Sequence, residues 1–298
     1  MYAYFHLNIF IFLKKITMKI AATVILYHPN EIVLKNIQSY IKSVEKLYIV
    51  DNTENPVLQI TNALYQLENI VYLHDGKNKG IAARLNQASN LAIKEGYTWL
   101  LTMDQDSFFR AEMLLNYLNC FTTFERKENV SMFGVSYYEK SSENVVCNAL
   151  AVNHLITSGS FLNLKLFPVI GGFDEKLFID EVDFEYCLRS AARGFGIVRF
   201  TNILLNHHLG EISSHRSFKT QKYTSRSLHA PVRLYYMTRN FLYVRSKYQQ
   251  SFGKEIIYKR KTLLNRFKNN ILYNKKRFAV IKNIIKGFND FRKGQMGK

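Results

Sequence analysis

Acidic residues, prolines and cysteines are scarce in this sequence, and the shortages limit what the protein can be. The 298 residues include 41 lysines and arginines but only 23 aspartates and glutamates, so the formal net charge is +18. With 4 prolines and a hydrophobic fraction of 47%, the chain is neither disordered nor fibrous. It has no run of about 18 apolar residues, so we expect no membrane-spanning helix. The sequence therefore predicts a globular protein of one or two domains.

Only three cysteines are present: Cys120, Cys147 and Cys187. An odd number without a CxxC pair is neither a disulfide framework nor a zinc site. We therefore expect free thiols in a reducing compartment, which points to a cytoplasmic protein.

The positive charge is concentrated at the C-terminal end. Residues 254–298 contain 14 basic and 2 acidic side chains, whereas the other 253 residues have a net charge of +6. Aliphatic residues among the lysines predict one or two amphipathic helices. Such a segment suits nucleic acid or an anionic membrane. Because its apolar residues are mainly aliphatic and the chain has no recognisable nucleic-acid module, we expect a peripheral position at the inner face of the cell membrane and no nucleic-acid partner.

The first 17 residues differ in character from the rest of the chain. They are apolar and aromatic from Tyr2 to Leu13, but they lack the basic leader and cleavage site of a signal peptide. A clear strand begins after Met18. We interpret residues 1–17 as translated upstream sequence, and the alternative is a short interfacial anchor. The remaining chain divides into a domain over residues 18–245 and a basic helical tail over residues 246–298.

Strand and helix signals alternate through the first half of the chain. Repeated βαβ units predict a Rossmann-like, mostly parallel central sheet with helices on both faces. In such sheets ligands bind at the carboxyl ends of the strands. The predicted strands are Ile20–Tyr27, Leu47–Val50, Ile70–Leu73 and Tyr97–Met103, and the predicted helices are Glu31–Ser43, Val57–Leu67 and Gly80–Glu95. The second half is less regular, with strands expected over Met132–Tyr138, Val145–Val152 and Ile203–Leu205 and an acidic helix near Asp180.

Carboxylates follow two of the predicted strands. Asp104 and Asp106 come directly after the fourth strand, where two carboxylates suit a hard divalent cation. Asp51 ends the second strand and suits a nucleobase N–H or a ribose hydroxyl. Both patterns also occur in ordinary solvated turns.

Three further groups of residues are candidates for substrate binding, base catalysis or metal binding. The helix that starts at Gly80 has small residues that let a ligand approach, and Arg84 suits a diphosphate. The tight acidic cluster Asp180-Glu181-x-Asp183 has carboxylates that suit general-base chemistry. His207 suits a metal or a phosphate. Each group also has an ordinary structural explanation. The residues after Gly80 could simply pack the helix, and the acidic residues near Asp180 could complement the dipole of a first helical turn. His207 could be a structural histidine.

In this order, these residues resemble the nucleotide-sugar glycosyltransferases of family 2, and in particular their bacterial rhamnosyltransferase branch. The resemblance covers roughly residues 18 to 245. It is carried by these stretches: Val50-Asp51-Asn52, the Asn78-x-Gly80-Ile81-Ala82-Ala83-x-x-Asn86 helix start, the DxD-type Leu100–Ser107 segment, Gly171–Glu175 with Leu177–Arg189, His207-x-Leu209-Gly210-Glu211, and Arg233-x-Tyr235-Tyr236-x-x-Arg239-Asn240.

The resemblance implies a GT-A fold, an Mg²⁺ or Mn²⁺ ion and an inverting single displacement. It implies that L-rhamnose moves from dTDP-L-rhamnose to a glycan acceptor, such as a lipid-linked O-antigen or another surface polysaccharide. The implied roles are nucleotide-sugar binding by Asp51, Asn52, Gly80, Arg84, Asn86, Asp104 and Arg239, metal binding by Asp104, Asp106 and His207, and base catalysis by Asp180 or Glu181. Gln87 departs from the family pattern, which has a glycine after the asparagine.

Two alternatives remain. The donor is another UDP- or dTDP-linked hexose or deoxysugar, or the protein is a basic nucleic-acid-binding or membrane-surface protein without catalytic activity. The second alternative leaves the DxD pair and the Asp180 cluster without a purpose.

Overall fold

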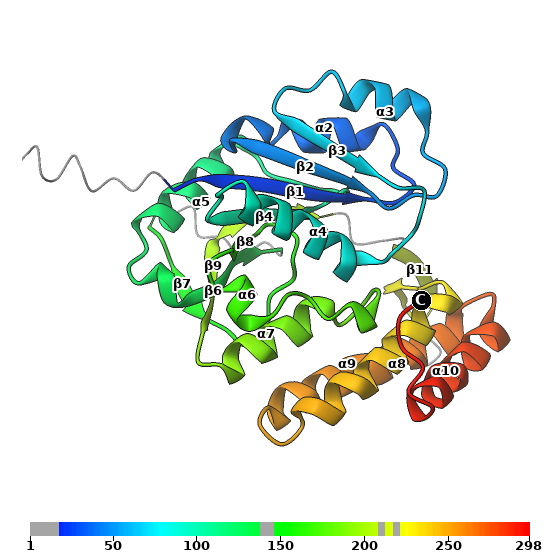
Figure 1. The fold of residues 1–298 in the computed structure, drawn as a ribbon. Helices are drawn as coiled ribbons and strands as arrows, with labels where there is room; N and C mark the ends of the chain where they lie inside the picture. Colours follow the sequence, from blue (N-terminus) through cyan, green and yellow to red (C-terminus); the bar gives the residue numbers. More distant parts are fainter. Residues whose placement is uncertain (1–17, 138–145, 208–211, 217–220) are drawn as a thin grey trace, which may run out of the picture.

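The core of the protein is a mostly parallel sheet of eight strands in the order β3-β2-β1-β4-β8-β6-β9-β7 (Figure 1). The structure is a computed structural model and describes residues 18–137, 146–207, 212–216 and 221–298. The segment interpreted as upstream sequence, residues 1–17, lies outside this part. The strands are β1 (Ile20–Leu26), β2 (Lys46–Asp51), β3 (Ile70–His74), β4 (Trp99–Asp104), β6 (Val130–Ser136), β7 (Ala149–Ala151), β8 (Ser160–Asn163) and β9 (Gly196–Leu204).

Helices cover both faces of this sheet. Successive side chains of a strand point to opposite faces, and in the central strands both sets are apolar. Along β1, Ala22 and Val24 pack into one core, and Ala21 and Ile25 pack into the other. The first core takes α2 (Ile32–Gln38), α3 (Leu58–Leu64) and α5 (Ala111–Thr123), and the second takes α4 (Ile81–Lys94), α6 (Phe167–Ile170), α7 (Val182–Ala192) and α8 (Pro231–Tyr248). Short 3₁₀ helices lie at Ile41–Ser43, Lys127–Asn129 and Glu175–Leu177. The predicted α/β architecture is confirmed.

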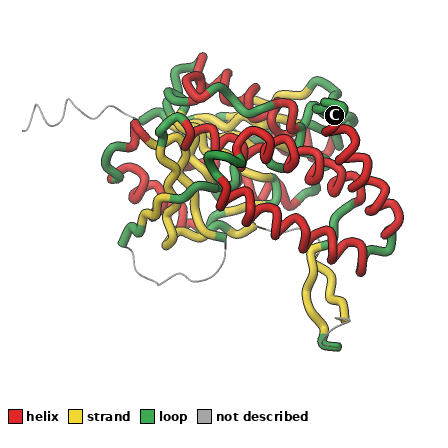
Figure 2. Tube along the Cα trace, turned by 90° about the horizontal axis from the view of Figure 1, so that it is seen from below, coloured by secondary structure: helices red, strands yellow, loops and turns green. Residues whose placement is uncertain are grey.

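The second half differs from the prediction in several strands, of which β8 matters most for the main sheet. β8 inserts between β4 and β6 and is antiparallel to both. This strand was not predicted, because it follows a small-residue turn and has no helix leading into it. Outside the main sheet, β5 (Ser107–Phe108) pairs with β10 (Asn206–His207), and β11 (Ile212–Arg216) pairs with β12 (Tyr223–Ser227) as a hairpin that projects from the body (Figure 2).

The basic C-terminal segment forms two helices that pack on the domain. They are α9 (Gly253–Tyr273) and α10 (Arg277–Arg292), and both contact α8. Ile256, Leu263 and Val280 are buried in this packing. The boundary expected at residue 245 falls inside α8. No helix in the described residues is long and apolar enough to cross a membrane.

The expectation of three free thiols is wrong. Cys120 of α5 forms a disulfide with Cys147, with the Cα atoms 5.3 Å apart. An odd number of cysteines excludes complete pairing but not a single bridge, and the fold brings these two together across 27 residues. Cys187 is free and buried, and burial raises the pKa of its thiol to about 12.

Candidate active site

The ends of three parallel strands bring two of the predicted carboxylates to one edge of the sheet. Leu26 lies in register with Asp51, and Asp51 with His74. On the other side of β1, Ile25 lies in register with Asp104. Parallel neighbours end at the same edge, where ligands of such sheets bind. Asp51 and Asp104 therefore flank the carboxyl end of β1.

The DxD turn after β4 is held by the residue between its two aspartates. The Gln105 side chain accepts a hydrogen bond from the Tyr27 N–H (2.8 Å) and donates one to the Tyr27 carbonyl (3.1 Å). The Gln105 carbonyl accepts a further bond from the Asn36 amide (2.8 Å). These bonds fix the backbone that carries Asp104 and Asp106. No role was predicted for Gln105.

Negative charge is crowded around Asp104. Burial, and then the charges of Asp106 and Asp183, raise the pKa of Asp104 to about 7, while Arg233 opposes the shift. Asp183 comes from the first turn of α7, and Arg233 from the first turn of α8. Asp183 belongs to the predicted acidic cluster without an individual role of its own, and no role was predicted for Arg233. The structure therefore adds Arg233 to the candidate site, and it indicates that Asp183 of the predicted acidic cluster lies near Asp104.

Arg233 links the two groups of carboxylates. Its guanidinium lies 3.2 Å from Asp180 Oδ1. The negative charge of Asp180, together with those of Asp104 and Asp106, raises the pKa of Arg233. The charges of the DxD turn and of the Asp180 turn therefore both act on Arg233, which is consistent with the single site that the sequence predicts.

The two candidate bases, Asp180 and Glu181, have different surroundings. Asp180 pairs with the half-exposed Arg233. Glu181 is 5% exposed, and its Oε2 lies 3.1 Å from Lys259 Nζ of α9. Burial raises the pKa of Glu181, and Lys259 opposes this shift. Asp183 accepts a hydrogen bond from the Phe184 N–H (2.8 Å).

Asp51, the last residue of β2, and the following Asn52 were both predicted to bind the nucleotide sugar, and both are buried. Asp51 accepts hydrogen bonds from the Tyr72 hydroxyl (2.7 Å) and the Thr53 N–H (2.8 Å). Asn52 accepts bonds from the Lys79 N–H (2.8 Å) and from Arg84 Nε (3.0 Å). Asn52 and Arg84 thereby hold the segment before α4 against the end of β2.

Arg84 and Arg239 have partners inside the protein. Arg84 is 1% exposed and pairs with Asp75 at 2.5 Å. Arg239 is also 1% exposed and donates to the Tyr235 hydroxyl (2.9 Å) and the Gly297 carbonyl (2.7 Å). Either arginine could contact the nucleotide sugar only if these hydrogen bonds and ion pairs broke. The contacts of Arg84 and Arg239 with the nucleotide sugar stay predictions. In the structure both arginines have a structural role.

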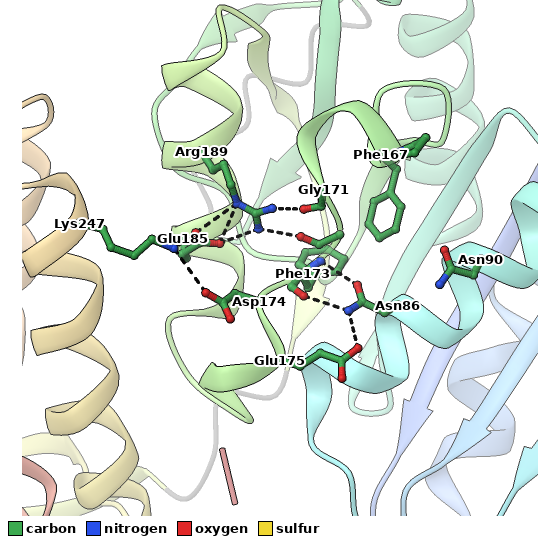
Figure 3. A pocket seen from close by; sticks show the side chains of 12 residues that line it. Asn86, Asn90, Phe167, Gly171, Phe173, Asp174, Glu175, Glu185, Arg189 and Lys247 are labelled. Atoms are coloured by element: carbon green, nitrogen blue, oxygen red, sulfur yellow. Dashed lines mark hydrogen bonds and ion pairs between the residues drawn. The ribbon is translucent and has the colours of Figure 1, made fainter. Parts of the chain in front are cut away.

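Asn86 lines a cavity of about 610 Å³ beside α4 and α7 (Figure 3). Its side chain accepts a bond from the Phe173 N–H (2.7 Å) and donates to the Phe173 carbonyl (2.9 Å). Arg189 and Lys247 line the same cavity and pair with the buried Glu185. Asp51, Asp104 and Asp180 do not line it. Asn86 is therefore not brought together with the strand-end carboxylates in this cavity.

Gly80 lies where a side chain does not fit. Its φ is +84°, and an added Cβ would lie 2.5 Å from the Phe178 carbonyl oxygen. That carbonyl accepts a hydrogen bond from the Ile81 N–H (2.7 Å). The close approach joins the start of α4 to the turn that carries Asp180.

We expect Gly80→Ala to lower the melting temperature by about 5 °C or more, because it adds a steric clash to an unfavourable φ. Gly194→Ala is the matched control, since Gly194 has a φ of +81° but no atom within 4 Å of the added Cβ. Differential scanning calorimetry of both variants separates the two contributions. Equal shifts in melting temperature would contradict the proposed clash.

The residues at the DxD turn fit a divalent cation. A cation would relieve the crowding of negative charge at Asp104. Asp106 is the adjacent carboxylate that could bind the same cation. β10 pairs with β5 so that the backbone of His207 lies opposite Ser107, next to Asp106. Within the described ranges no group of three or more His, Cys, Asp or Glu side chains forms a complete metal site. Two carboxylates with phosphate and water oxygens are a common environment for Mg²⁺.

Comparisons with known proteins give one curated relative and several solved structures. No family model matches the chain. The dTDP-rhamnosyl transferase RfbF of Shigella flexneri is 28% identical over 256 residues, which cover 77% of this chain and 81% of the relative.

The structure of GalNAc-T7 with UDP, GalNAc and Mn²⁺ aligns with a TM-score of 0.58 at 9% identity, and Staphylococcus aureus TarS aligns with 0.56 at 14%. Both alignments cover 93% of this chain, which spans about half the length of those two proteins (56% and 49%). TarS 1-349 in complex with UDP-GlcNAc aligns with a TM-score of 0.51, also at 14% identity, and is covered to 93%.

These likenesses confirm the GT-A fold and the resemblance to nucleotide-sugar glycosyltransferases that the sequence predicted. The chain is a glycosyltransferase. The curated relative supports the narrower prediction of a rhamnosyltransferase.

Proposed function

We propose that the protein is an inverting glycosyltransferase that moves L-rhamnose from dTDP-L-rhamnose to a glycan acceptor. The observation that carries this proposal is the ion pair of Arg233 with Asp180, together with the charges of Asp104 and Asp106 that act on the same arginine. The relative, a dTDP-rhamnosyl transferase, supports the donor. Another hexose or deoxysugar on UDP or dTDP is the second candidate, since the TarS structure holds UDP-GlcNAc.

The donor nucleotide would bind at the carboxyl ends of β1, β2 and β4. Asp51 and Asn52 would contact the base, and the segment before Gly80, which Arg84 holds, would border the nucleotide. Arg233 suits the diphosphate because its side chain is 49% exposed and lies among the carboxylates.

Asp104 and Asp106 would hold Mg²⁺ or Mn²⁺, with His207 as a further ligand or phosphate contact. The Mn²⁺ of the GalNAc-T7 structure supports this assignment. When bound, the cation neutralises charge on the leaving diphosphate.

The reaction is one displacement at the anomeric carbon. The acceptor oxygen forms a bond to that carbon as the bond to the diphosphate oxygen breaks, and dTDP leaves. A carboxylate of the 180–183 turn takes the hydroxyl proton. The sequence favours Asp180 for this role. We favour Asp183, because its charge helps to raise the pKa of Asp104 whereas Asp180 is paired with Arg233.

A donor screen tests the proposed function. Purified protein is incubated with Mn²⁺, a rhamnose-terminated or other glycan acceptor panel, and dTDP-L-rhamnose, UDP-GlcNAc, UDP-glucose or dTDP-glucose in turn. We expect nucleoside diphosphate release with dTDP-L-rhamnose above all others. Release from another donor alone would establish the second candidate and overturn rhamnosyl transfer.

The acceptor would be lipid-linked, as for an O-antigen or another surface polysaccharide, and the enzyme would work at the inner face of the cell membrane. α9 and α10 support this position because they leave apolar side chains exposed among basic ones. A cavity of about 380 Å³ between α8, α9 and α10 has apolar walls and is bordered by Arg245 and Arg260. Leu264, Ile285 and Phe288 line it and are 53%, 55% and 46% exposed.

We expect the protein to sediment with vesicles that contain phosphatidylglycerol, more at low salt than at high salt. Replacing both Ile285 and Phe288 by serine should weaken this binding at least about tenfold, because each inserted side chain contributes about 1.5–3 kcal/mol. The control replaces the exposed Val57 and Leu58 at the start of α3 by serine, which should leave binding unchanged. A wild-type protein that stays in the supernatant would contradict the membrane assignment.

A further inference from the structure

The turn before α7 has an unusual backbone. Phe178, Asp180 and Glu181 have φ values of +54°, +61° and +64°. Residues with side chains rarely adopt this region, and they keep it only where the surrounding structure holds them there. The turn carries the candidate bases, so the contacts that hold it matter for catalysis.

Helix α8 supplies one set of these contacts. The Asn240 side-chain amide donates to the carbonyls of Ile179 (2.6 Å) and Asp180 (3.2 Å). The ring of Tyr236 stacks on Phe178, with centroids 5.1 Å apart. These contacts hold the backbone of the turn, but they do not compensate the charge of Glu181.

Helix α9 supplies the partner for that charge. Lys259 Nζ lies 3.1 Å from Glu181 Oε2 and 4.8 Å from the centroid of the Phe184 ring. Asp183 is the next carboxylate whose charge acts on Lys259. A buried carboxylate without a partner is strongly unfavourable. Loss of Lys259 would therefore drive Glu181 toward solvent and move its neighbours in the turn.

We propose that Lys259 is a positioning residue for the transfer reaction: by pairing with the buried Glu181, it holds the 180–183 turn so that Asp180 and Asp183 face the DxD carboxylates. The proposal rests on the proposed function. It gives the basic C-terminal segment a second role, because the same helix α9 that carries exposed basic and apolar residues completes the active site.

The test uses the full-length protein and the variants Lys259→Met, Glu181→Gln and Lys259→Met/Glu181→Gln. Lys261→Met is the matched control, because Lys261 is an exposed lysine on the same helix. We expect Lys259→Met to lower kcat about 100-fold, the scale of a small misplacement of reacting groups, with the KM for the donor changed less than about threefold. The double variant should recover most of the lost kcat, because a neutral amide at position 181 needs no cationic partner. Melting temperatures are measured for all variants.

The outcomes separate the two proposals. A wild-type protein without turnover on any nucleotide sugar would defeat the proposed function. If the wild type is active, a Lys259→Met kcat close to that of Lys261→Met overturns the positioning role. A loss that Glu181→Gln does not rescue, at an unchanged melting temperature, also overturns it. Rescue of kcat in the double variant supports it, since stability alone does not predict dependence on the charge at position 181.

Discussion

Replacing Asp106 by alanine is expected to reduce turnover at least about 1000-fold while the protein stays folded. Asp106 is one of the two carboxylates proposed to hold the cation, and it lies on a turn whose backbone is fixed through Gln105. Its removal takes away a metal ligand without opening the core. The charge crowding at Asp104 also decreases, so the fold should not become less stable.

The measurement is dTDP release at saturating Mn²⁺, together with a thermal melt. The effect should lie in kcat more than in the KM for the donor, because the charge on the diphosphate grows as the glycosidic bond breaks. Glu112→Ala, which removes an exposed carboxylate from the first turn of α5, serves as the control and should behave like the wild type. Turnover of the Asp106 variant within about tenfold of the wild type would remove the metal assignment, since such ligands contribute more than that.

The parts of the fold that depend on local pattern were predictable. The apolar runs at β1, β2, β3 and β4 and the helices between them follow from composition and spacing, and parallel pairing then brings Asp51 and Asp104 to one edge. β8 was not predictable in the same way. It is four residues long and joins the sheet through antiparallel partners that are distant in sequence.

The site was predictable to the extent that its residues lie at strand ends. Asp180 pairs with Arg233, and the charges of Asp104 and Asp106 also raise the pKa of Arg233, an arrangement that the order of motifs led us to expect. Lys259 was not predictable, because its pairing with Glu181 depends on how α9 packs against α7. Residues 254–298 contain 14 basic side chains, and no local signal distinguishes Lys259 from the others. The disulfide between Cys120 and Cys147 is a long-range contact of the same kind.

Substitutions at Asp180 and Asp183 are expected to show which of the two carboxylates is the base. We expect Asp183→Asn to lower kcat about 1000-fold, within the range of a lost general base, and Asp180→Asn to lower it less. The reason lies in their partners. Asp180 forms an ion pair with Arg233 at 3.2 Å, so part of its role would be to hold that arginine at the proposed diphosphate site. The charge of Asp183 helps to raise the pKa of Asp104, which indicates that the two carboxylates lie near each other.

The two variants should also differ in how they fail. Asp183→Asn keeps the shape of the side chain and the Arg233 pair, so dTDP and donor binding should stay close to wild type while kcat falls. Asp180→Asn releases Arg233, so the KM for the donor should change along with kcat. Glu181→Gln should have the smallest effect of the three on kcat, because Glu181 is 5% exposed and faces Lys259. If Asp180→Asn instead shows the larger loss of kcat with unchanged donor binding, Asp180 is the base, and the ion pair with Arg233 must open when the acceptor binds.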